Sequence, residues 1–343
     1  MLFHRMESRD IRVNLATEDY LMNHYQINEP LFLMYIQAPC VIVGRNQNVF
    51  DEVKLKHLEE DEVVLTRRLS GGGAVYEDLG NISFSFVGEK EQLTFGDYTS
   101  IVRPIVEGLQ AMGVENVAVN GRNDILIGDK KISGNAMYTK KGKTFSHGTL
   151  MYDVDLTKLP EYLNVSKEKL AAKGIQSVTS RVTNIKPFLT SAYQQLTIEG
   201  FRDELIRRIY QIENLSEVAH KEIILTKSDQ EAINQKVETI YGNEEWVYGH
   251  HEPFTMKSRQ YIPNVGLLEA RFQIVEGKMS QVNFLGDYFG EKDSHQLAEK
   301  LEETEFKISS LKNRLKDVQV SDYFSRLEES TFIDFLMRGL PND

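Results

Sequence analysis

The chain of 343 residues has a single cysteine, Cys40, and no long apolar run. One thiol excludes both an intramolecular disulfide and a metal centre built from several thiolates of the same chain. The eight histidines include no HExxH pattern, so nothing indicates a zinc site. The stretch MLFHRMESRD lacks the apolar core of a signal peptide, and no run approaches the roughly 18 apolar residues of a membrane span. We therefore expect a cytoplasmic protein without a membrane partner.

Positive charge is also in short supply. Lys and Arg total 40 against 51 Asp and Glu, which gives a net charge of −11 at neutral pH. This sign argues against a broad nucleic-acid surface, and we expect no nucleic-acid partner. A local basic patch stays open, because Lys140, Lys141 and Lys143 crown one expected hairpin. They form either a docking patch or a solvated turn. No pattern indicates an oligomer, so a monomer is the default expectation.

Hydrophobic periodicity predicts a mixture of helices and strands. Helical spacing occurs over residues 11–25, 50–60, 96–112 and 198–212, and strand-like runs occur at PLFLMYIQ, CVIVG, VVLTRRL, AVYED and NISFSFVG. Residues 117–153 then read as a meander, with turn chemistry at Gly128-Asp129 and at Lys140-Lys141-Gly142. The expected class is α+β, with a mostly antiparallel sheet flanked by helices.

A domain boundary is expected at residues 242–243, in the polar stretch Gly242–Glu245. Residues 1–242 would form the first domain and residues 243–343 a small α+β accessory domain. In the second domain, three strand-like runs (PFTMKSRQYI, GLLEARFQIVEG and MSQVNFLGDYF) precede a helical stretch over residues 296–318. Its apolar stripe consists of Leu297, Leu301, Ile308, Leu311 and Leu315. We expect this helix to pack on its own small sheet, with a coiled coil as the alternative.

The stretch RRLSGGGAVYEDLGN places three consecutive glycines, Gly71–Gly73, after Arg67 and Arg68. A dinucleotide fingerprint requires a helix after the glycines, whereas AVYED reads as a strand. A P-loop at Gly142-Lys143-Thr144 fails because position 137 is methionine. Two interpretations remain. The loop surrounds an anion that the arginines neutralise, or it is a plain β-turn with two surface arginines.

Three later segments bear on this choice. GRNDILIGDKKISGNA puts Asn123 and Asp124 on one strand and Lys131 on the next. These residues form either a cross-strand ion pair or a Mg²⁺ site beside a phosphate-binding cation. SHGTL carries His147, and a lone histidine is more often structural. KGIQSVTSRVTN, residues 173–184, has few means of packing itself and suits a loop ordered by a ligand.

Taken in order, RR-x-SGGGAVYEDLGN, GRNDI…KKISGNA, HGTL and KGIxSVxSRVTN closely resemble the lipoate–protein ligases, as does PCVIVGRNQN near the start. The resemblance covers residues 1–240, and the remainder corresponds to the C-terminal domain of two-domain members. It implies a biotin/lipoate ligase-like catalytic domain. It also implies an enzyme that converts lipoate and Mg-ATP to lipoyl-AMP and passes the lipoyl group to a lysine of lipoyl domains. Those acceptors are E2 subunits of 2-oxoacid dehydrogenases and the glycine cleavage H protein.

The resemblance also assigns roles to residues. Lys131 would be the catalytic electrophile that bridges the lipoyl carbonyl and the phosphate, and Asp124 would carry magnesium. The glycine loop would bind lipoate, and Lys173–Arg181 would fold over the adenylate. The implied substrate- and nucleotide-binding residues are Arg68, Ser70, Gly71, Gly72, Gly73, Ala74, Val75, Tyr76, Asn81, Asn123, Lys131, His147, Gly148, Thr149, Lys173 and Arg181. Candidates for an apolar acyl slot, each equally well explained as core, are Val75, Tyr76, Phe84 and Leu150.

Three rival interpretations remain: a biotin–protein ligase, a protein that only carries lipoate, and a cysteine-dependent octanoyl or lipoyl transferase. The transferase would need Cys40 as its nucleophile. The setting APCVIVG predicts that Cys40 lies on a buried strand, where burial raises the pKa of a thiol and removes its nucleophilicity. The C-terminal domain is expected to act as a mobile lid or brace.

Overall fold

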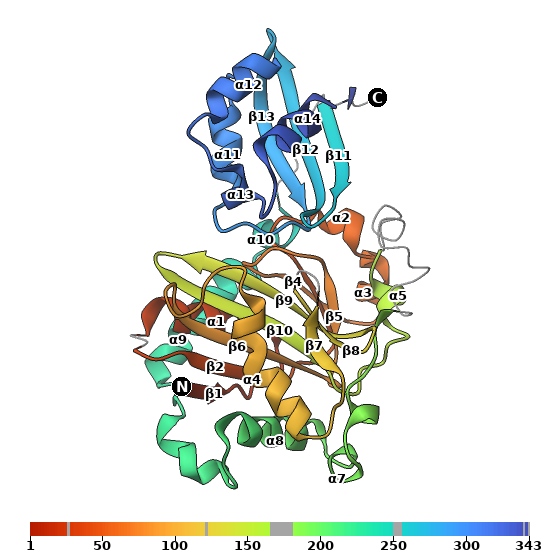
Figure 1. Cartoon of the computed structure of the whole chain (residues 1–343), viewed down its shortest axis with the longest axis vertical. Helices are drawn as coiled ribbons and strands as arrows, with labels where there is room; N and C mark the ends of the chain where they lie inside the picture. The colour runs from red at the N-terminus through yellow and green to blue at the C-terminus, as the bar shows by residue number, and fades with distance from the viewer. Residues whose placement is uncertain (26–27, 121–122, 165–180, 250–255, 339, 342–343) are drawn as a thin grey trace.

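The computed structural model describes residues 1–25, 28–120, 123–164, 181–249, 256–338 and 340–341. The chain folds into a large part, and a small part from residue 256 onward, drawn in cyan and blue, stands above it (Figure 1). The short helix α10 (Glu244–Tyr248) lies where the two parts meet in this view.

A seven-stranded sheet forms the centre of the large part. In spatial order its strands are β1 (Leu2–Arg5), β2 (Leu31–Tyr35), β6 (Asn81–Glu89), β10 (Lys143–Met151), β9 (Lys130–Lys140), β8 (Asp124–Ile127) and β7 (Val117–Asn120). All neighbours are antiparallel except β1 and β2, so the predicted α+β class with a mostly antiparallel sheet is confirmed. The predicted meander is confirmed as well, because β7 to β10 pair in chain order.

A second sheet of three strands packs near the first. Its order is β4 (Val64–Arg67), β3 (Cys40–Val43) and β5 (Val75–Glu77). Cys40 opens the central strand and is 1% exposed, and burial raises the pKa of its thiol well above the ordinary value. The predicted buried strand at Cys40 is therefore confirmed.

Helices cover both faces of the large sheet. Among the described residues of the large part these are α1 (Ile11–His24), α2 (Val49–Glu52), α3 (Leu55–Glu60), α4 (Tyr98–Ala111), α5 (Leu159–Tyr162), α7 (Ser191–Gln194), α8 (Ile198–Tyr210), α9 (Lys227–Lys236) and α10, with 3-10 or π-helical segments η2 (Lys186–Phe188), η3 (Leu215–Lys221) and η4 (Val237–Tyr241). The single helix expected over residues 50–60 is two short helices, because the chain is extended at Val53.

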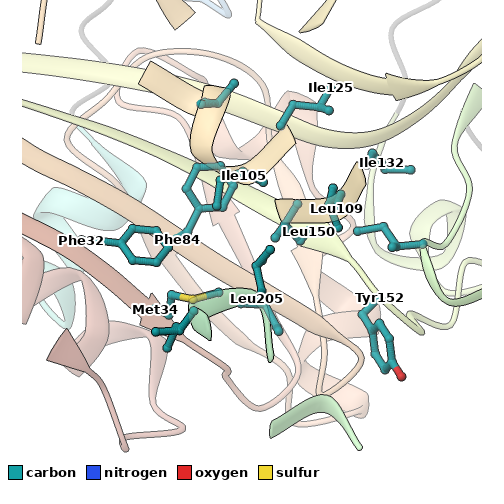
Figure 2. Close-up of a cluster of buried hydrophobic side chains, with 14 of the residues drawn as sticks. Phe32, Met34, Phe84, Ile105, Leu109, Ile125, Ile132, Leu150, Tyr152 and Leu205 are labelled. Carbon is teal, nitrogen blue, oxygen red and sulfur yellow. The ribbon is translucent and has the colours of Figure 1, made fainter. Parts of the chain in front are cut away.

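The main core lies between the large sheet and helices α4 and α8. Because side chains alternate along a strand, Phe84 of β6 enters this core while Ser83 and Ser85 face the opposite side. Figure 2 shows Phe32, Met34 and Leu150 from the other strands in the same layer. The opposite face of the sheet is covered by α1 and by the three-stranded sheet, and that face carries the polar residues of the site.

The small part has its own sheet and its own core. Its strands are β13 (Lys278–Gly286), β12 (Gly266–Val275), β11 (Met256–Ile262) and the two-residue β14 (Leu340–Pro341), and its helices are α11 (Ser294–Leu301), α12 (Ile308–Leu315), α13 (Val320–Tyr323) and α14 (Glu329–Met337). The helices pack on this sheet around a separate hydrophobic cluster.

The single helix predicted over residues 296–318 is wrong. The chain leaves α11 at Glu302 and takes a left-handed backbone at Glu303, with φ of 60°. It then pairs with Met279, whose N–H donates to the Thr304 carbonyl at 2.8 Å. These backbone bonds to β13 replace a further turn of helix, and Ile308 is 48% exposed instead of completing the apolar stripe. Among the described residues, no helix has the length and apolar character needed to cross a membrane.

Candidate active site

A cavity of about 130 Å³ lies between the large sheet, helix α1 and the glycine loop Gly71–Gly73. We call it the central cavity. Its lining comes from both sheets, from α1 and from the small part: Leu15, Tyr35, Ile42, Arg68, Gly72, Gly73, Ala74, Val75, Glu77, Ser83, Asn123, Lys131, Gly134, Asn135, Ala136, His147, Gly148, Thr149 and Phe289.

The three glycines of the loop do not all lack a side chain for the same reason. A side chain at Gly71 would collide with the carbonyl oxygen of Tyr288, which belongs to the small part. Gly72 has φ of 93°, and a Cβ there would lie 2.9 Å from the Phe289 ring. Only Gly73 has open space in place of a side chain. The sequence suggested that all three glycines make room for a ligand, whereas two of them make room for the small part.

The two arginines before the loop have separate tasks. Arg67 is 4% exposed, and its guanidinium donates to backbone carbonyls, among them Gly44, Gln47 and Val247 at 2.7–3.0 Å. It therefore fastens the end of α10 to the three-stranded sheet and does not line the central cavity. The alternative of a turn with two surface arginines is wrong, because Arg68 is buried too.

Arg68 is the cation that does line the central cavity. Its Nη2 donates to the carbonyls of Gly71 and Gly73 at 2.8 Å each, which fixes the shape of the loop from inside. Its Nε donates to Ser70 Oγ at 3.1 Å. Burial lowers the pKa of Arg68 to about 10, which still leaves the guanidinium charged at neutral pH. A buried positive charge beside a cavity attracts an anionic ligand.

A charged network formed by three residues lies at the cavity edge nearest β8. Lys131 Nζ lies 2.9 Å from Asp124 Oδ1, and Arg181 bonds the other oxygen of the same carboxylate. Of the two interpretations left open for these residues, the cross-strand ion pair between Asp124 and Lys131 is present in the structure. A register shift between Ile125 and Leu126 accompanies it, and Lys131 Nζ lies against Gly134, where a side chain would collide with it. Lys131 is thus aimed across its own strand into the cavity.

The residues at this edge fit a magnesium ion that arrives with a nucleotide. Mg²⁺ prefers oxygen ligands and is commonly held by one or two carboxylates together with substrate phosphates. Asp124 and its chain neighbour Asn123 both carry such oxygens. Among the described residues, no three His, Cys, Asp or Glu side chains converge to form an all-protein metal site.

Glu77 is a cavity residue that the sequence reasoning missed. It is 2% exposed, and three donors converge on its Oε2: Gln37 Nε2, Asn81 Nδ2 at 2.9 Å and Ser83 Oγ at 2.6 Å. Burial raises the pKa of this carboxyl to about 7. Strand alternation could have revealed it, because Val75 and Glu77 share one face of β5.

His147 lies in the wall of the central cavity and is bonded through both ring nitrogens. Its Nε2 lies 2.7 Å from Ser70 Oγ, and its Nδ1 lies 3.0 Å from Glu18 Oε2. All three side chains are buried. Glu18 was not among the predicted residues, although it shares a face of α1 with Leu15, three residues earlier.

The small part completes the wall of the central cavity. The Gly72 N–H donates to the Tyr288 carbonyl at 3.3 Å, and the Phe289 ring packs against Tyr98 with 6.3 Å between ring centres. Arg45 Nη2 and Asp293 Oδ2 form an ion pair at 2.6 Å beside this contact. The sequence did not reveal Phe289, because no local pattern predicts that an aromatic residue shortly after a strand will contact the other part of the molecule.

The central cavity collects ten of the predicted site residues: Arg68, Gly72, Gly73, Ala74, Val75, Asn123, Lys131, His147, Gly148 and Thr149. Arg181 joins them through Asp124. Ser70, Gly71 and Asn81 lie behind the wall, where they bond or pack against residues that line it. Lys173 lies outside the described residues.

Tyr76 and two proposed slot residues point elsewhere. The Tyr76 side chain packs with Tyr162, with 5.0 Å between ring centres, in a cluster on the far side of β5. Phe84 and Leu150 belong to the main core behind the sheet. Of the four candidates for the acyl slot, only Val75 lines the central cavity.

Comparison with known proteins places the chain in a family. Residues 10–210 match the model of the lipoyl protein ligase A/B catalytic domain, and residues 251–336 match that of the bacterial lipoate protein ligase C-terminus. Lipoate-protein ligase LplJ of Bacillus subtilis is 36% identical over 327 residues, covering 95% of this chain and 97% of that protein.

Solved structures agree with this match. The crystal structure of P. falciparum LipL1 in complex with lipoate covers 98% of both chains with a TM-score of 0.76 at 22% identity, which shows the fold. A lipoate-protein ligase A bound with ATP covers 72% of this chain and 98% of its own at 28% identity, with a TM-score of 0.58. A bi-partite lipoate protein ligase of Thermoplasma acidophilum, studied with its E2 lipoyl domain, covers 74% and 97% at 28% identity, with a TM-score of 0.59.

The α+β fold, the buried arginine beside the glycine loop and these matches together define an enzyme of the acyl-ligase type. The chain belongs to the lipoate–protein ligases, and its activity is that of a lipoate–protein ligase. Of the rival interpretations, the cysteine transferase is also opposed by the structure, because its required thiol is buried in β3 with a raised pKa.

Proposed function

We propose that this ligase works in two steps that share the central cavity. In the first, a carboxylate oxygen of lipoate attacks the α-phosphorus of ATP, so that lipoyl-AMP forms and pyrophosphate leaves. In the second, the neutral amine of an acceptor lysine attacks the lipoyl carbonyl carbon, the amide forms, AMP leaves with the former carboxylate oxygen, and the amine loses its proton. The observation that carries the proposal is the placement of Lys131, Arg68 and the open Gly73 around one cavity.

Electrostatics explain why these residues suit the first step. A carboxylate must approach a polyanionic nucleotide, and the repulsion is offset by preorganised cations. Arg68 supplies a buried charge on the loop side, and Lys131 supplies a second one on the sheet side. Lys131 already holds a carboxylate oxygen of Asp124 at 2.9 Å, which is the contact that a phosphate or acyl oxygen would take over.

Asp124 would exchange partners during the reaction. In the structure its two oxygens bond Lys131 and Arg181. When ATP binds with Mg²⁺, Asp124 would hold the ion together with the phosphates, and the ion would neutralise part of the phosphate charge. Lys131 and Arg181 would then be released toward the nucleotide. ATP in this role is supported by the related lipoate-protein ligase A bound with ATP.

The segment after residue 180 is joined to Lys131 through the backbone. The Thr183 N–H donates to the Lys131 carbonyl at 3.0 Å, and Arg181 bonds Asp124 from the same segment. Residues 173–180 lie outside the described residues. The role that we propose for residues 173–181 is to cover the adenylate and exclude the water that would hydrolyse it, and the contacts of Arg181 and Thr183 suit that role.

The acceptor that we propose is a lipoyl domain, such as that of an E2 subunit or the H protein. The archaeal relative that was studied with its E2 lipoyl domain supports this choice. With a net charge of −11 the ligase has no general attraction for an acidic domain, so docking would depend on local cations such as Lys140 and Lys141 at the β9–β10 turn. If reversing both charges leaves the rate of acceptor modification unchanged, this docking site is excluded.

Lipoate-dependent exchange of pyrophosphate into ATP tests the first step directly. Lys131→Ala should lower the exchange rate by about 10²–10³, by analogy with the loss of a single transition-state donor. Lys130→Ala is the matched control, because it removes the same charge from the neighbouring position of β9, outside the cavity lining. Near-normal exchange by Lys131→Ala, or equal losses in both variants, would refute the assignment. An acyl-thioester on Cys40 formed without ATP would instead revive the transferase.

A further inference from the structure

A chain of hydrogen bonds connects helix α1 to the glycine loop through the wall of the central cavity. It runs from Glu18 to His147 Nδ1 at 3.0 Å, from His147 Nε2 to Ser70 Oγ at 2.7 Å, and from Ser70 Oγ to Arg68 Nε at 3.1 Å. Arg68 Nη2 then holds the carbonyls of Gly71 and Gly73. The four linked side chains come from α1, from β10 and from the segment that leads into the loop.

When the imidazole of His147 is neutral, every bond in the chain has a fixed direction. A glutamate carboxylate accepts hydrogen bonds and donates none, so the proton of the neutral imidazole must sit on Nδ1 of His147. Nε2 then carries a lone pair and accepts from the Ser70 hydroxyl. Since the hydroxyl hydrogen is committed to His147, the oxygen lone pairs are left to accept from Arg68 Nε–H. Every donor in the chain thus has an acceptor, and Nδ1 of His147 is shared by the two oxygens of Glu18.

The direction reverses when Glu18 is removed. The imidazole loses the acceptor at Nδ1, and its proton can move to Nε2, which then donates toward Ser70. Ser70 would receive hydrogen bonds from both Arg68 and His147 while its own hydroxyl hydrogen loses its partner. Leaving a buried polar group without a partner costs more free energy than one hydrogen bond contributes. We therefore expect the guanidinium of Arg68 to shift.

Arg68 is sensitive to such a shift because its own bonds all go to neutral acceptors, namely Ser70 Oγ and the carbonyls of Ile42, Gly71 and Gly73. The same guanidinium sets the loop conformation, including φ of 93° at Gly72, and supplies positive charge to the cavity. Its orientation therefore determines both the shape and the charge of the site at which lipoate would bind.

We infer that Glu18 is a positioning residue for the glycine loop, acting through His147, Ser70 and Arg68. This inference rests on the proposed binding of lipoate in the central cavity. The same three groups, Ser70, His147 and Glu18, could also form a nucleophilic triad of the Ser-His-acid type. The positioning role is favoured because Ser70 is 1% exposed and is not part of the cavity lining, so an acyl group has no path to its oxygen.

Paired variants test the chain of bonds. Glu18→Leu removes the acceptor, Glu18→Gln keeps a carbonyl oxygen that can accept from Nδ1–H, and Ser70→Ala breaks the middle of the chain. Glu18→Leu and Ser70→Ala should each lower kcat/KM for lipoate in pyrophosphate exchange by about 10- to 100-fold, mainly through KM. Glu18→Gln should stay within about threefold of the wild type, since it keeps the bond direction.

The double variant Glu18→Leu/Ser70→Ala shows whether the two single losses in kcat/KM for lipoate multiply. Glu18 and Ser70 share a partner in His147, so their effects should fall well short of multiplying. Asp19→Asn is the matched control, because Asp19 is a buried acid on the same helix whose ion pair with Lys236 points away from the cavity. It should leave the KM for lipoate unchanged.

Two further measurements separate the possible failures. Nitrogen NMR of labelled His147 should report the Nδ1–H tautomer in the wild type and in Glu18→Gln, a result that does not depend on turnover. The inference would be overturned if the losses in kcat/KM for Glu18→Leu and Ser70→Ala multiply in the double variant. It would also be overturned if Glu18→Gln loses as much as Glu18→Leu. In both cases exchange by the wild type would still support the two-step function. An acyl ester trapped on Ser70 would overturn it in favour of the triad. A wild-type enzyme without lipoate-dependent exchange would overturn the proposed function itself.

Discussion

Glu77 offers the sharpest test of the electrostatics of the cavity. Its carboxyl is 2% exposed and has a pKa of about 7 in the folded protein, against an ordinary value of 4.5. Burial is the main cause, since removal from water penalises the charged form. The change to examine is Glu77→Gln, which imitates the protonated acid: one oxygen can still accept from Gln37, Asn81 and Ser83.

The direction in which the free energy of unfolding changes with pH follows from proton binding to Glu77. Because the folded-state pKa lies above the unfolded value, the folded protein binds this proton more tightly than the unfolded chain does. Its contribution to the free energy of unfolding is complete below pH 4.5 and is lost as the pH rises to about 7. At about 1.4 kcal/mol per unit of pKa, the loss is about 3 kcal/mol as an order of magnitude. Glu77→Gln has no titrating carboxyl at this position, so its free energy of unfolding should not show this loss as the pH rises.

The measurement is the free energy of unfolding in denaturant at several values between pH 5 and 8. Trp246, the single tryptophan, is a suitable probe because its indole N–H donates to the Arg67 carbonyl at 2.9 Å in the large part. The free energy of unfolding of the wild type minus that of Glu77→Gln should fall by about 2.5 kcal/mol across this range, because part of the loss occurs below pH 5.

Glu269→Gln is the control for this experiment. Glu269 is equally buried, but ion pairs with Arg259 and Arg271 lower its pKa, so its contribution is lost only as the pH falls below about 4.5. Because Glu269 lies in the small part, unfolding of this variant is followed by circular dichroism and not by Trp246, and its difference from the wild type in the free energy of unfolding should be flat between pH 5 and 8. Parallel curves for wild type and Glu77→Gln over this range would refute the reasoning about Glu77.

Three further substitutions test the loop, the buried thiol and the contribution of the small part. Gly72→Val should weaken lipoate binding more than tenfold in calorimetry, because a β-branched residue at φ of 93° is strained and would meet the Phe289 ring; an unchanged Kd would make the loop a plain turn. Cys40→Ala should keep most of the ligase activity and cost about 1 kcal/mol in denaturant unfolding, and a complete loss of activity without unfolding would contradict this. Phe289→Ala should raise the KM for lipoate while the secondary structure seen by circular dichroism is preserved; an unchanged KM would show that Phe289 only covers the cavity.

Much of the fold follows from local patterns. The alternation of β6 and the turn chemistry at Lys141 and Gly142 predict the correct strands, because each is decided by residues close in sequence. The helix over residues 296–318 fails for the opposite reason. Its break at Glu303 is stabilised by backbone bonds to Met279, which no local periodicity contains.

Some residues of the site can be predicted from local sequence and others cannot. Lys131 and Asp124 can be paired from the sequence because a short turn joins their strands. Glu18 and Phe289 cannot be found so easily, since Glu18 acts from α1 behind His147 and Phe289 reaches the cavity from the small part. Arg67 and Arg68 are neighbours of the same type, so the sequence does not say which of them lines the cavity. Only the register of β4 directs Arg67 to the backbone carbonyls of Gly44 and Gln47.

The position of Cys40 has a consequence for the redox chemistry of the substrate. Lipoate carries a cyclic disulfide, and a thiolate within reach would open that ring by exchange and leave a mixed disulfide on the enzyme. Exchange needs an accessible, ionised thiol. The one thiol in this chain lies at the start of β3, 1% exposed, with its pKa raised by burial. The enzyme thus handles a reactive disulfide while presenting no accessible thiol of its own that could open the ring.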